Sequence, residues 1–159
     1  MENGETPRYV FRVNLKRERG VWRTLSLRGD YTLHDFHECI FKAFDRYDDD
    51  HLYSFYFPRA QPRRDIGNPS PKEYTSPVVF EEPDSYREEG VLDASETELR
   101  SLNLHLGDTF EYLFDFGASW WHQVKVITVE HTDRATEADL PTVVKRHGES
   151  PDQYPEHED

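Results

Sequence analysis

Residues 9 to 47, "YVFRVNLKRERGVWRTLSLRGDYTLHDFHECIFKAFDRY", change from a two-residue hydrophobic period to a helical one, and this change decides the fold. Apolar and polar side chains alternate over residues 9–16, which predicts a half-buried strand. The "RERG" that follows predicts a tight turn. Residues 21–28 then predict the returning strand, with Leu25 and Leu27 inward. The first part of the chain is therefore expected to form a β-hairpin rich in basic residues.

The next segment predicts an α-helix over residues 33–47. Thr32 precedes it and Asp35 lies three residues later, which is a variant of the capping box. A hairpin followed by a helix predicts an α+β fold, with one main helix on one face of a mostly antiparallel sheet and a β-grasp-like ββα start. Apolar residues recur at steps of three and four and are expected to face the core: Leu33, Phe36, Ile40, Phe44 and Tyr47.

The middle of the chain predicts irregular segments. Residues 58–77 contain five prolines and no usable period, which predicts a long loop. A short strand is expected at "PVVFEE" and a short helix at "DASETELRSLNL".

A second hairpin is expected across Gly117. "TFEYLFDF" and "WWHQVKVITVEH" both alternate, and Gly removes the steric penalty of a tight turn. Phe114 and Phe116 are expected inward, with Trp120 and His122 where that face ends.

Length and composition predict a single domain over residues 1–159, with its core at about 9–130 and a polar, acidic C-terminal arm over 131–159. Only 35% of residues are hydrophobic, but 14% are aromatic, and such rings bury much area each. No apolar run approaches the roughly 18 residues of a membrane span, and the first residues do not resemble a secretion signal. We therefore expect a cytoplasmic protein without a membrane partner. Cys39 is the single cysteine, which excludes an intramolecular disulfide and a Cys-cluster metal site.

The formal net charge is −13, yet residues 8–28 carry seven Lys and Arg against one acid. The overall charge repels phosphate and argues against non-specific nucleic-acid binding by the whole domain. A basic hairpin can still meet an acidic partner. We therefore expect a protein partner and keep nucleic acid as the weaker alternative.

Five pieces of the chain, taken together, resemble the plasmid pRiA4b ORF-3-like family, whose members are sometimes described as insertion-element passenger proteins. The pieces are "VWR" (21–23), "TLHDFHECI" (32–40), "DDDHLYSF" (48–55), "LGDTFEYLFDFG" (106–117) and "WWHQVKV" (120–126). The resemblance implies an α+β domain related to β-grasp folds and a family whose biochemical activity is unassigned. The recurrent family positions correspond here to Trp22, Arg23, His37, His51, Asp115, Gly117, Trp120 and His122.

The chain departs from the family pattern in two places. After Phe-Gly the family often has Asp, where this chain has Ala118. Many members carry cysteines near the C-terminus, whereas "HGESPDQYPE" has none. A role for either group is thus absent here.

A histidine and carboxylate cluster is the first candidate site. His37, His51 and His122, with Asp49, Asp50 or Asp115, would offer ligands suited to Zn, Mn or Fe. No histidine pair lies four residues apart on one helix, so the sequence does not enforce such a site. The alternative, which we favour, is that the histidines at 37 and 122 are hydrogen-bonded structural residues and the Asp run is a solvated helix end.

Trp22 on the basic hairpin is the second candidate. By parity it shares a face with Arg28 of its own strand and with Arg12 and Lys16 of the first strand, so it could stack a base or receive an acidic peptide. The favoured alternative is a tryptophan covered by the C-terminal arm or a second subunit. The candidate binding residues are Trp22, Arg23, Trp120 and Asp115.

Three functions follow from these features. The first is a non-catalytic binding or adaptor module without a cofactor, which presents the basic hairpin, the Pro/Arg-rich loop and the acidic arm to a protein partner. The second is a metal-dependent, for example hydrolytic, enzyme with ligands among His37, His51, His122 and Asp115. The third and weakest is a nucleic-acid accessory protein linked to mobile elements. Nucleophilic catalysis has little support, because Cys39 is expected away from the centre of the apolar stripe and no Gly-x-Ser-x-Gly elbow exists.

Overall fold

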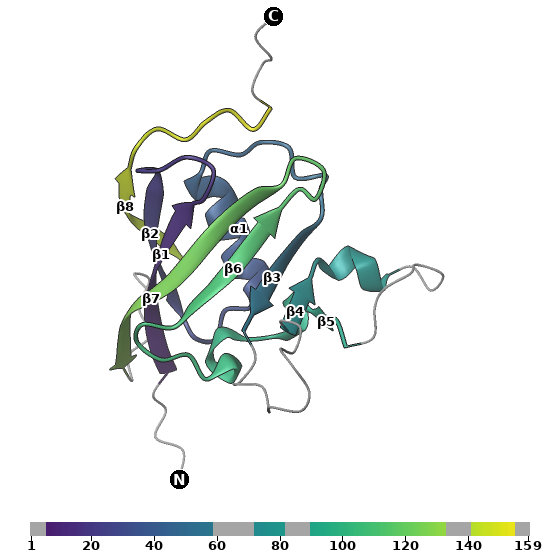
Figure 1. Cartoon of the computed structure of the whole chain (residues 1–159). Coiled ribbons are helices and arrows are strands. Elements are labelled where there is room, and N and C mark those ends of the chain that lie inside the picture. The colour runs from purple at the N-terminus through teal and green to yellow at the C-terminus, as the bar shows by residue number, and fades with distance from the viewer. Residues whose placement is uncertain (1–5, 59–71, 82–89, 133–140, 155–159) are drawn as a thin grey trace, which may run out of the picture.

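A computed structural model describes residues 6–58, 72–81, 90–132 and 141–154, and it places an α-helix on one face of an eight-stranded sheet (Figure 1). The elements are β1 (Thr6–Leu15), β2 (Trp22–Arg28), α1 (Leu33–Ala43), β3 (Tyr53–Phe57), β4 (Lys72–Thr75), β5 (Leu92–Asp93), β6 (Thr109–Phe114), β7 (Trp120–Thr132) and β8 (Thr142–His147). The strand order is β5-β4-β3-β6-β7-β1-β2-β8, and every neighbouring pair is antiparallel except β4 with β5. The predicted α+β class with a mostly antiparallel sheet is confirmed. None of the helices in the described ranges has the length and apolarity that a membrane crossing requires.

The first hairpin and the start of the helix are as predicted. β1 pairs antiparallel with β2, and Leu25 and Leu27 are buried. α1 begins with a complete capping box: the Thr32 hydroxyl accepts from the Asp35 backbone N–H at 3.1 Å, and the Asp35 carboxylate accepts from the Thr32 N–H at 2.8 Å. This local hydrogen bonding fixes where the chain turns from the sheet into the helix.

The helix ends at Ala43, earlier than predicted. Asp45 adopts a left-handed conformation with φ of 58°, which the helix cannot continue through. The Ala43 carbonyl accepts hydrogen bonds from Arg23 at 2.8 Å and from Arg146 at 2.7 Å, so two guanidinium groups cap the negative end of the helix dipole. Tyr47 lies beyond this end and is 62% exposed, so its predicted place on the core face is wrong.

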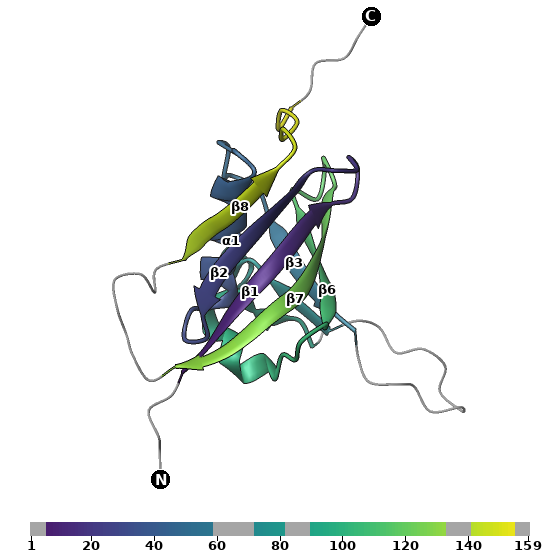
Figure 2. The same ribbon diagram turned by 90° about the vertical axis from the view of Figure 1, so that its left-hand side faces the viewer.

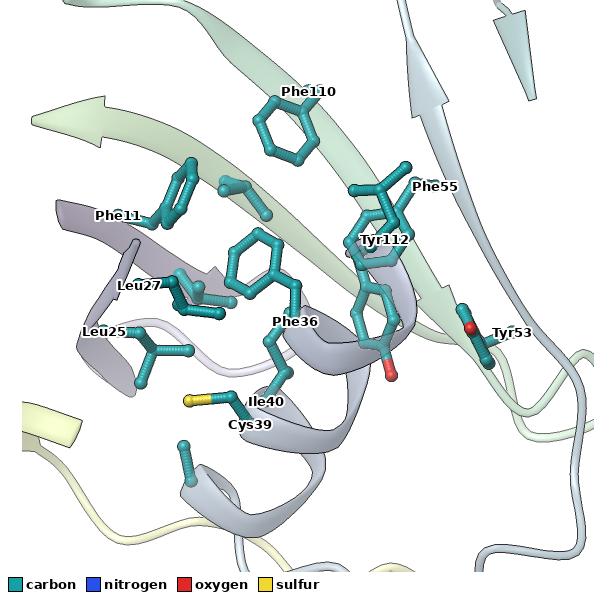
Figure 3. Close-up of a cluster of buried hydrophobic side chains, with 14 of the residues drawn as sticks. Phe11, Leu25, Leu27, Phe36, Cys39, Ile40, Tyr53, Phe55, Phe110 and Tyr112 are labelled. Carbon is teal, nitrogen blue, oxygen red and sulfur yellow. The ribbon is translucent and has the colours of Figure 1, made fainter. Parts of the chain in front are cut away.

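The core is built from aromatic rings between α1 and the sheet (Figure 3). Phe36 points from the helix toward Phe11 of β1, with ring centroids 4.4 Å apart, and stacks on Phe55 of β3 at 5.6 Å. Cys39, predicted away from the centre of the apolar stripe, is also buried here, although more exposed, at 9%, than Phe36 or Ile40. Burial raises the pKa of the Cys39 thiol to about 11, which makes it unreactive as a nucleophile at neutral pH.

Two of the short elements differ from prediction. "PVVFEE" begins with a 3-10 helix, Pro77–Phe80, rather than a strand, because Pro77 favours the first turn of a helix and lacks the N–H that a strand ladder needs. The strand β4 lies just before it, inside the predicted loop, where it is held by pairing with β3. The rest of that predicted loop, 59–71, lies outside the described residues. "DASETELRSLNL" forms two 3-10 turns, Ala94–Glu96 and Leu99–Leu102.

The second hairpin, β6 with β7, is confirmed, but its turn differs in detail. Asp115, with φ of 65°, and Ser119, with φ of 59°, supply the left-handed conformations at the two ends of the turn. Phe116 lies within the turn and is 42% exposed, so the prediction that it faces inward is wrong.

Part of the predicted C-terminal arm is a strand of the sheet. β8 pairs antiparallel with β2 (Figure 2), and only Val143 of β8 packs against the core, so the segment shows little hydrophobic pattern. After β8 the chain turns at Gly148, where φ is 79° and an added Cβ would lie 2.4 Å from the Gly20 carbonyl. Gln153 is then buried and binds the backbone of Tyr47 and Asp48.

Candidate functional site

His37 belongs to a buried hydrogen-bonded cluster under the helix. It is 6% exposed, its Nδ1 lies 2.6 Å from the Tyr112 hydroxyl, and its ring stacks on Tyr53 with centroids 3.7 Å apart. His34 Nδ1 in turn lies 2.7 Å from the Tyr53 hydroxyl. Burial, with a smaller contribution from His34, lowers the pKa of His37 to about 3. His37 is therefore neutral at pH 7 and serves as a structural partner of Tyr112.

His122 occupies a similar environment on β7. It is 2% exposed, it pairs across the sheet with Tyr112, and its Nδ1 lies 3.3 Å from the Tyr112 backbone carbonyl. Its ring packs edge-on against Phe44 at 5.0 Å. Burial lowers the pKa of His122 to about 3, and the nearby Arg46 charge acts in the same direction.

His51 lies elsewhere, at the end of the second hairpin. Its Nε2 is 3.3 Å from an Asp48 carboxylate oxygen and also hydrogen-bonds the Tyr154 hydroxyl, while its Nδ1 is 3.6 Å from Asp115. The buried Asp115 carboxylate is mainly a turn former, because it accepts from the N–H groups of Gly117 and Ala118, each at 3.1 Å. A hollow of about 460 Å³ opens beside this group.

The three candidate metal ligands do not meet in one site. His37 and His122 bind opposite ends of Tyr112, its hydroxyl and its carbonyl, whereas His51 pairs with carboxylates on the loops. Across the described ranges, no group of three or more His, Cys, Asp or Glu is arranged to hold a metal ion. The geometry favours the structural interpretation of His37 and His122.

Trp120 is fully buried, at 0% exposure, so no partner can reach it. Its Nε1 donates to the Gln153 carbonyl at 3.2 Å, and the guanidinium carbons of Arg17 and Arg46 lie 4.2 and 4.4 Å from its ring centroid. Arg46 is also buried and donates to the Pro151 carbonyl, but its Nε and Nη2 find no hydrogen-bond partner among the described residues. Trp120 therefore anchors the segment around Gln153 and stabilises a buried charge.

Arg23 is buried as well, although β2 lies beside the basic turn. Besides capping α1, its guanidinium donates to the carbonyls of Trp22 at 2.8 Å and His147 at 2.9 Å. It thus connects the helix end to β2 and β8, which is a structural role.

Trp22 differs from both, because it is half-buried on the sheet face opposite the helix. The His147 ring stacks on it from β8, with centroids 5.0 Å apart and an interplanar angle of 5°. The Arg12 guanidinium lies over it from β1 at 4.2 Å, and Lys145 Nζ is 5.6 Å away. Trp22 therefore lies between side chains of β1 and β8, and β8 belongs to the predicted C-terminal arm. Two cations, Arg12 and Lys145, lie beside its ring.

Three cations on this open face form what we call the basic row: Arg12, Lys125 and Lys145. The register places Lys145 opposite Thr24, Thr24 opposite Arg12, and Arg12 opposite Lys125, so the row crosses four adjacent strands (Figure 2). None of the three forms an ion pair with any residue in the described ranges. Like charges directly opposite on adjacent strands are destabilising, so this arrangement is unfavourable in isolation.

The sequence predictions missed Trp121 as a binding candidate. It is half-buried on the same open face, 5.5 Å from the Tyr56 ring, with Lys16 Nζ 5.9 Å from its centroid. A hollow of about 360 Å³, which we call the Trp121 hollow, opens here. Strand parity could have found it, since Trp121 and Lys125 share a face. The lining residues are Lys16, Arg17, Glu111, Ser119 and Trp121.

Comparison with known proteins adds a family and a fold relative. The model of a family described as "Plasmid pRiA4b ORF-3-like protein" matches residues 7–154. A search of curated proteins finds no match. Among solved structures, a crystal structure from Methanosarcina mazei Go1, titled as a protein of unknown function, is similar with a TM-score of 0.66. The two are 16% identical, and the similarity covers 93% of this chain and 73% of the other. At this identity the likeness supports the fold alone.

Proposed function

The chain belongs to the plasmid pRiA4b ORF-3-like family, and from that premise we propose that it is a non-catalytic binding module whose open sheet face receives an acidic, extended segment of a protein partner. The observation that carries the proposal is the basic row beside Trp22. The chain has a formal net charge of −13, with ample acids to neutralise three cations, yet the described residues leave the row without a carboxylate partner.

An acidic partner would relieve this unfavourable arrangement. Arg12 and Lys125 lie directly opposite each other, so a carboxylate placed between them would gain from both charges. Arg12 is already held over Trp22, which reduces the side-chain entropy lost on binding. Complementary charge of this kind mainly raises the association rate and the specificity.

Protein is favoured over nucleic acid for two reasons. A long polyanion would extend beyond the row over a surface whose net charge is negative, whereas a short segment that stays at the row lies more than the screening length, about 8 Å at physiological salt, from most of that charge. Trp22 is also already stacked by His147 and lies under the Arg12 guanidinium, so a nucleobase would have to compete with these contacts for the ring. A short acidic peptide segment avoids both difficulties.

Other expectations remain part of this proposal. They are a cytoplasmic location, a link to mobile elements, and a relation of the ββα start to β-grasp folds. The metal-dependent enzyme gains no support from the positions of His37, His51 and His122, so we do not propose it as a second function.

The test is binding of a fluorescein-labelled, twelve-residue Glu-rich peptide, followed by anisotropy. We expect the affinity to fall steeply from 50 to 200 mM NaCl. The double variant Lys125→Ala/Lys145→Ala should bind about tenfold more weakly. The matched control, Lys42→Ala/Lys72→Ala, removes the same charge on the other side of the sheet and should change affinity by less than about twofold.

Two results would contradict the proposal. Equal losses in the two double variants would mean that only net charge matters. Tighter binding of a twelve-residue oligo-dT than of the peptide would instead support the nucleic-acid accessory hypothesis.

A further inference from the structure

The Trp121 hollow lies on the same open face as the basic row, and it combines an aromatic floor with a cationic rim. Its volume of about 360 Å³ falls at the small end of the usual range for ligand pockets, roughly 300–1,000 Å³. We propose that this hollow anchors an aromatic side chain of the acidic segment that binds the basic row. This inference rests on the proposed function and specifies the partner's chemistry.

The floor of the hollow favours an aromatic occupant. The Trp121 indole lies 5.5 Å from the Tyr56 ring at an interplanar angle of 38°, so a third ring can pack against the exposed part of the indole in an offset or edge-on arrangement. The aliphatic stems of Lys16 and Arg17 border the hollow and can cover such a ring. Tryptophan and arginine are the residue types that most often dominate binding energy at protein interfaces.

The rim of the hollow favours an acid next to that ring. Arg17 donates to the carbonyls of Ala118 at 2.6 Å and Ser119 at 3.3 Å, and it has no carboxylate partner among the described residues. Lys16 pairs with Glu111, and both side chains are about two-fifths exposed, at 43% and 40%. Exposed pairs of this kind contribute little to stability, so a partner carboxylate can replace Glu111 as the partner of Lys16.

The sheet register predicts the spacing between the two contact points. The acidic contact is expected between Arg12 and Lys125, which lie opposite each other, and Trp121 lies four residues before Lys125 on β7. Four residues along the strand give about 13 Å between this contact and Trp121. An extended chain covers this distance in about three to four residues. The partner segment is therefore expected to contain an acidic residue and an aromatic residue about three to four positions apart, in either order.

The test uses two labelled peptides that differ at one position: a Glu-rich peptide with Tyr four residues from its central Glu, and the same peptide with Ser in place of Tyr. We expect the Tyr peptide to bind about tenfold more tightly. Trp121→Ala should abolish this difference while leaving the affinity for the Ser peptide unchanged. Lys125→Ala/Lys145→Ala should weaken both peptides.

The chain has three tryptophans, so ¹⁵N indole resonances report on each contact point separately. The Tyr peptide should shift the signals of Trp22 and Trp121 and leave that of the buried Trp120 in place. The Ser peptide should shift that of Trp22 alone. This measurement uses the unaltered protein, so it decides the question even if Trp121→Ala does not fold.

The outcomes separate the two proposals. Equal affinity for the two peptides, or an unmoved Trp121 signal while Trp22 shifts, would overturn the aromatic anchor and leave the acidic-segment proposal standing. No salt-dependent binding of either peptide and no indole shift would overturn both.

Discussion

The two faces of the sheet use the same residue types for different purposes. On the helix side, Trp120 and Arg23 are buried and bound to fixed backbone carbonyls. On the open side, Trp22 and Trp121 are half-buried and Arg12 has no counter-charge in the described ranges. Because successive side chains on a strand point to opposite faces, the neighbours Trp120 and Trp121 serve opposite faces. Residue type alone therefore does not identify a binding site in this protein.

The pair Trp120 and Trp121 offers the largest contrast in stability. Trp120→Ala should lower the free energy of unfolding by about 3–5 kcal/mol, because it leaves a cavity and removes the ring on which the buried Arg46 guanidinium lies. Trp121→Ala should cost about 1 kcal/mol, since its side chain is only partly buried. Urea unfolding of both variants measures the difference. A larger loss for Trp121→Ala would contradict the assignment of the two faces.

Arginine gives the next contrast. Arg23→Met should lower the free energy of unfolding by about 2–3 kcal/mol, because it removes charge-assisted hydrogen bonds to Ala43 and His147. It should also release β8, which hydrogen exchange would detect as lost amide protection in that strand. Arg12→Met, on the open face, should change stability by no more than about 0.5 kcal/mol. Retained protection of β8 in Arg23→Met would show that Arg23 does not hold the strand.

The parts of the fold that periodicity encodes were predictable. The hairpins at 9–28 and 109–126 alternate cleanly, and the capping box marks the start of α1. β8 was missed because it is an edge strand with one core-facing apolar side chain, and its place depends on pairing with a segment more than 110 residues away in sequence. The end of α1 was missed because a left-handed Asp45 and two distant arginines set it.

The candidate site was predictable only in part. Alternation placed Trp22 and Arg12 on one face, and the structure bears this out. The sequence could not place Lys145 beside them, because that needs the register of β8. It also could not distinguish buried Arg23 from half-buried Arg12, because both lie on alternating strands with basic neighbours. His37 and His122 fit a ligand pattern in sequence, and only their separate bonds to Tyr112 reveal a structural role.

The buried histidines should make stability depend on pH. The pKa of both His37 and His122 is lowered by burial to about 3, below the value of 6.5 for a solvated histidine. The unfolded chain therefore takes up protons first, so stability is complete above about pH 6.5 and is lost as the pH falls toward 3. Between pH 7.5 and 5.5 we expect a loss of about 1 kcal/mol for each histidine. The free energy of unfolding, measured with urea at several pH values in this range, should fall less with decreasing pH in His37→Gln or His122→Gln than in the unaltered protein. In the double variant it should be nearly independent of pH. An unchanged pH dependence in the double variant would contradict the effect.

The smallest effect on stability belongs to the basic row, and it tests the contrast between the two faces from the other direction. Lys125→Ala/Lys145→Ala should alter the free energy of unfolding by no more than about 0.5 kcal/mol, because both side chains are exposed and neither has an ion-pair partner among the described residues. Relief of the repulsion between Lys125 and Arg12 should make any change stabilising, most clearly at low salt. The control Lys42→Ala/Lys72→Ala lacks this like-charge neighbour and should show no salt-dependent gain. Unchanged stability together with weaker binding would indicate that the basic row serves binding rather than folding. A clear loss of stability would instead group the basic row with the structural residues of the helix side.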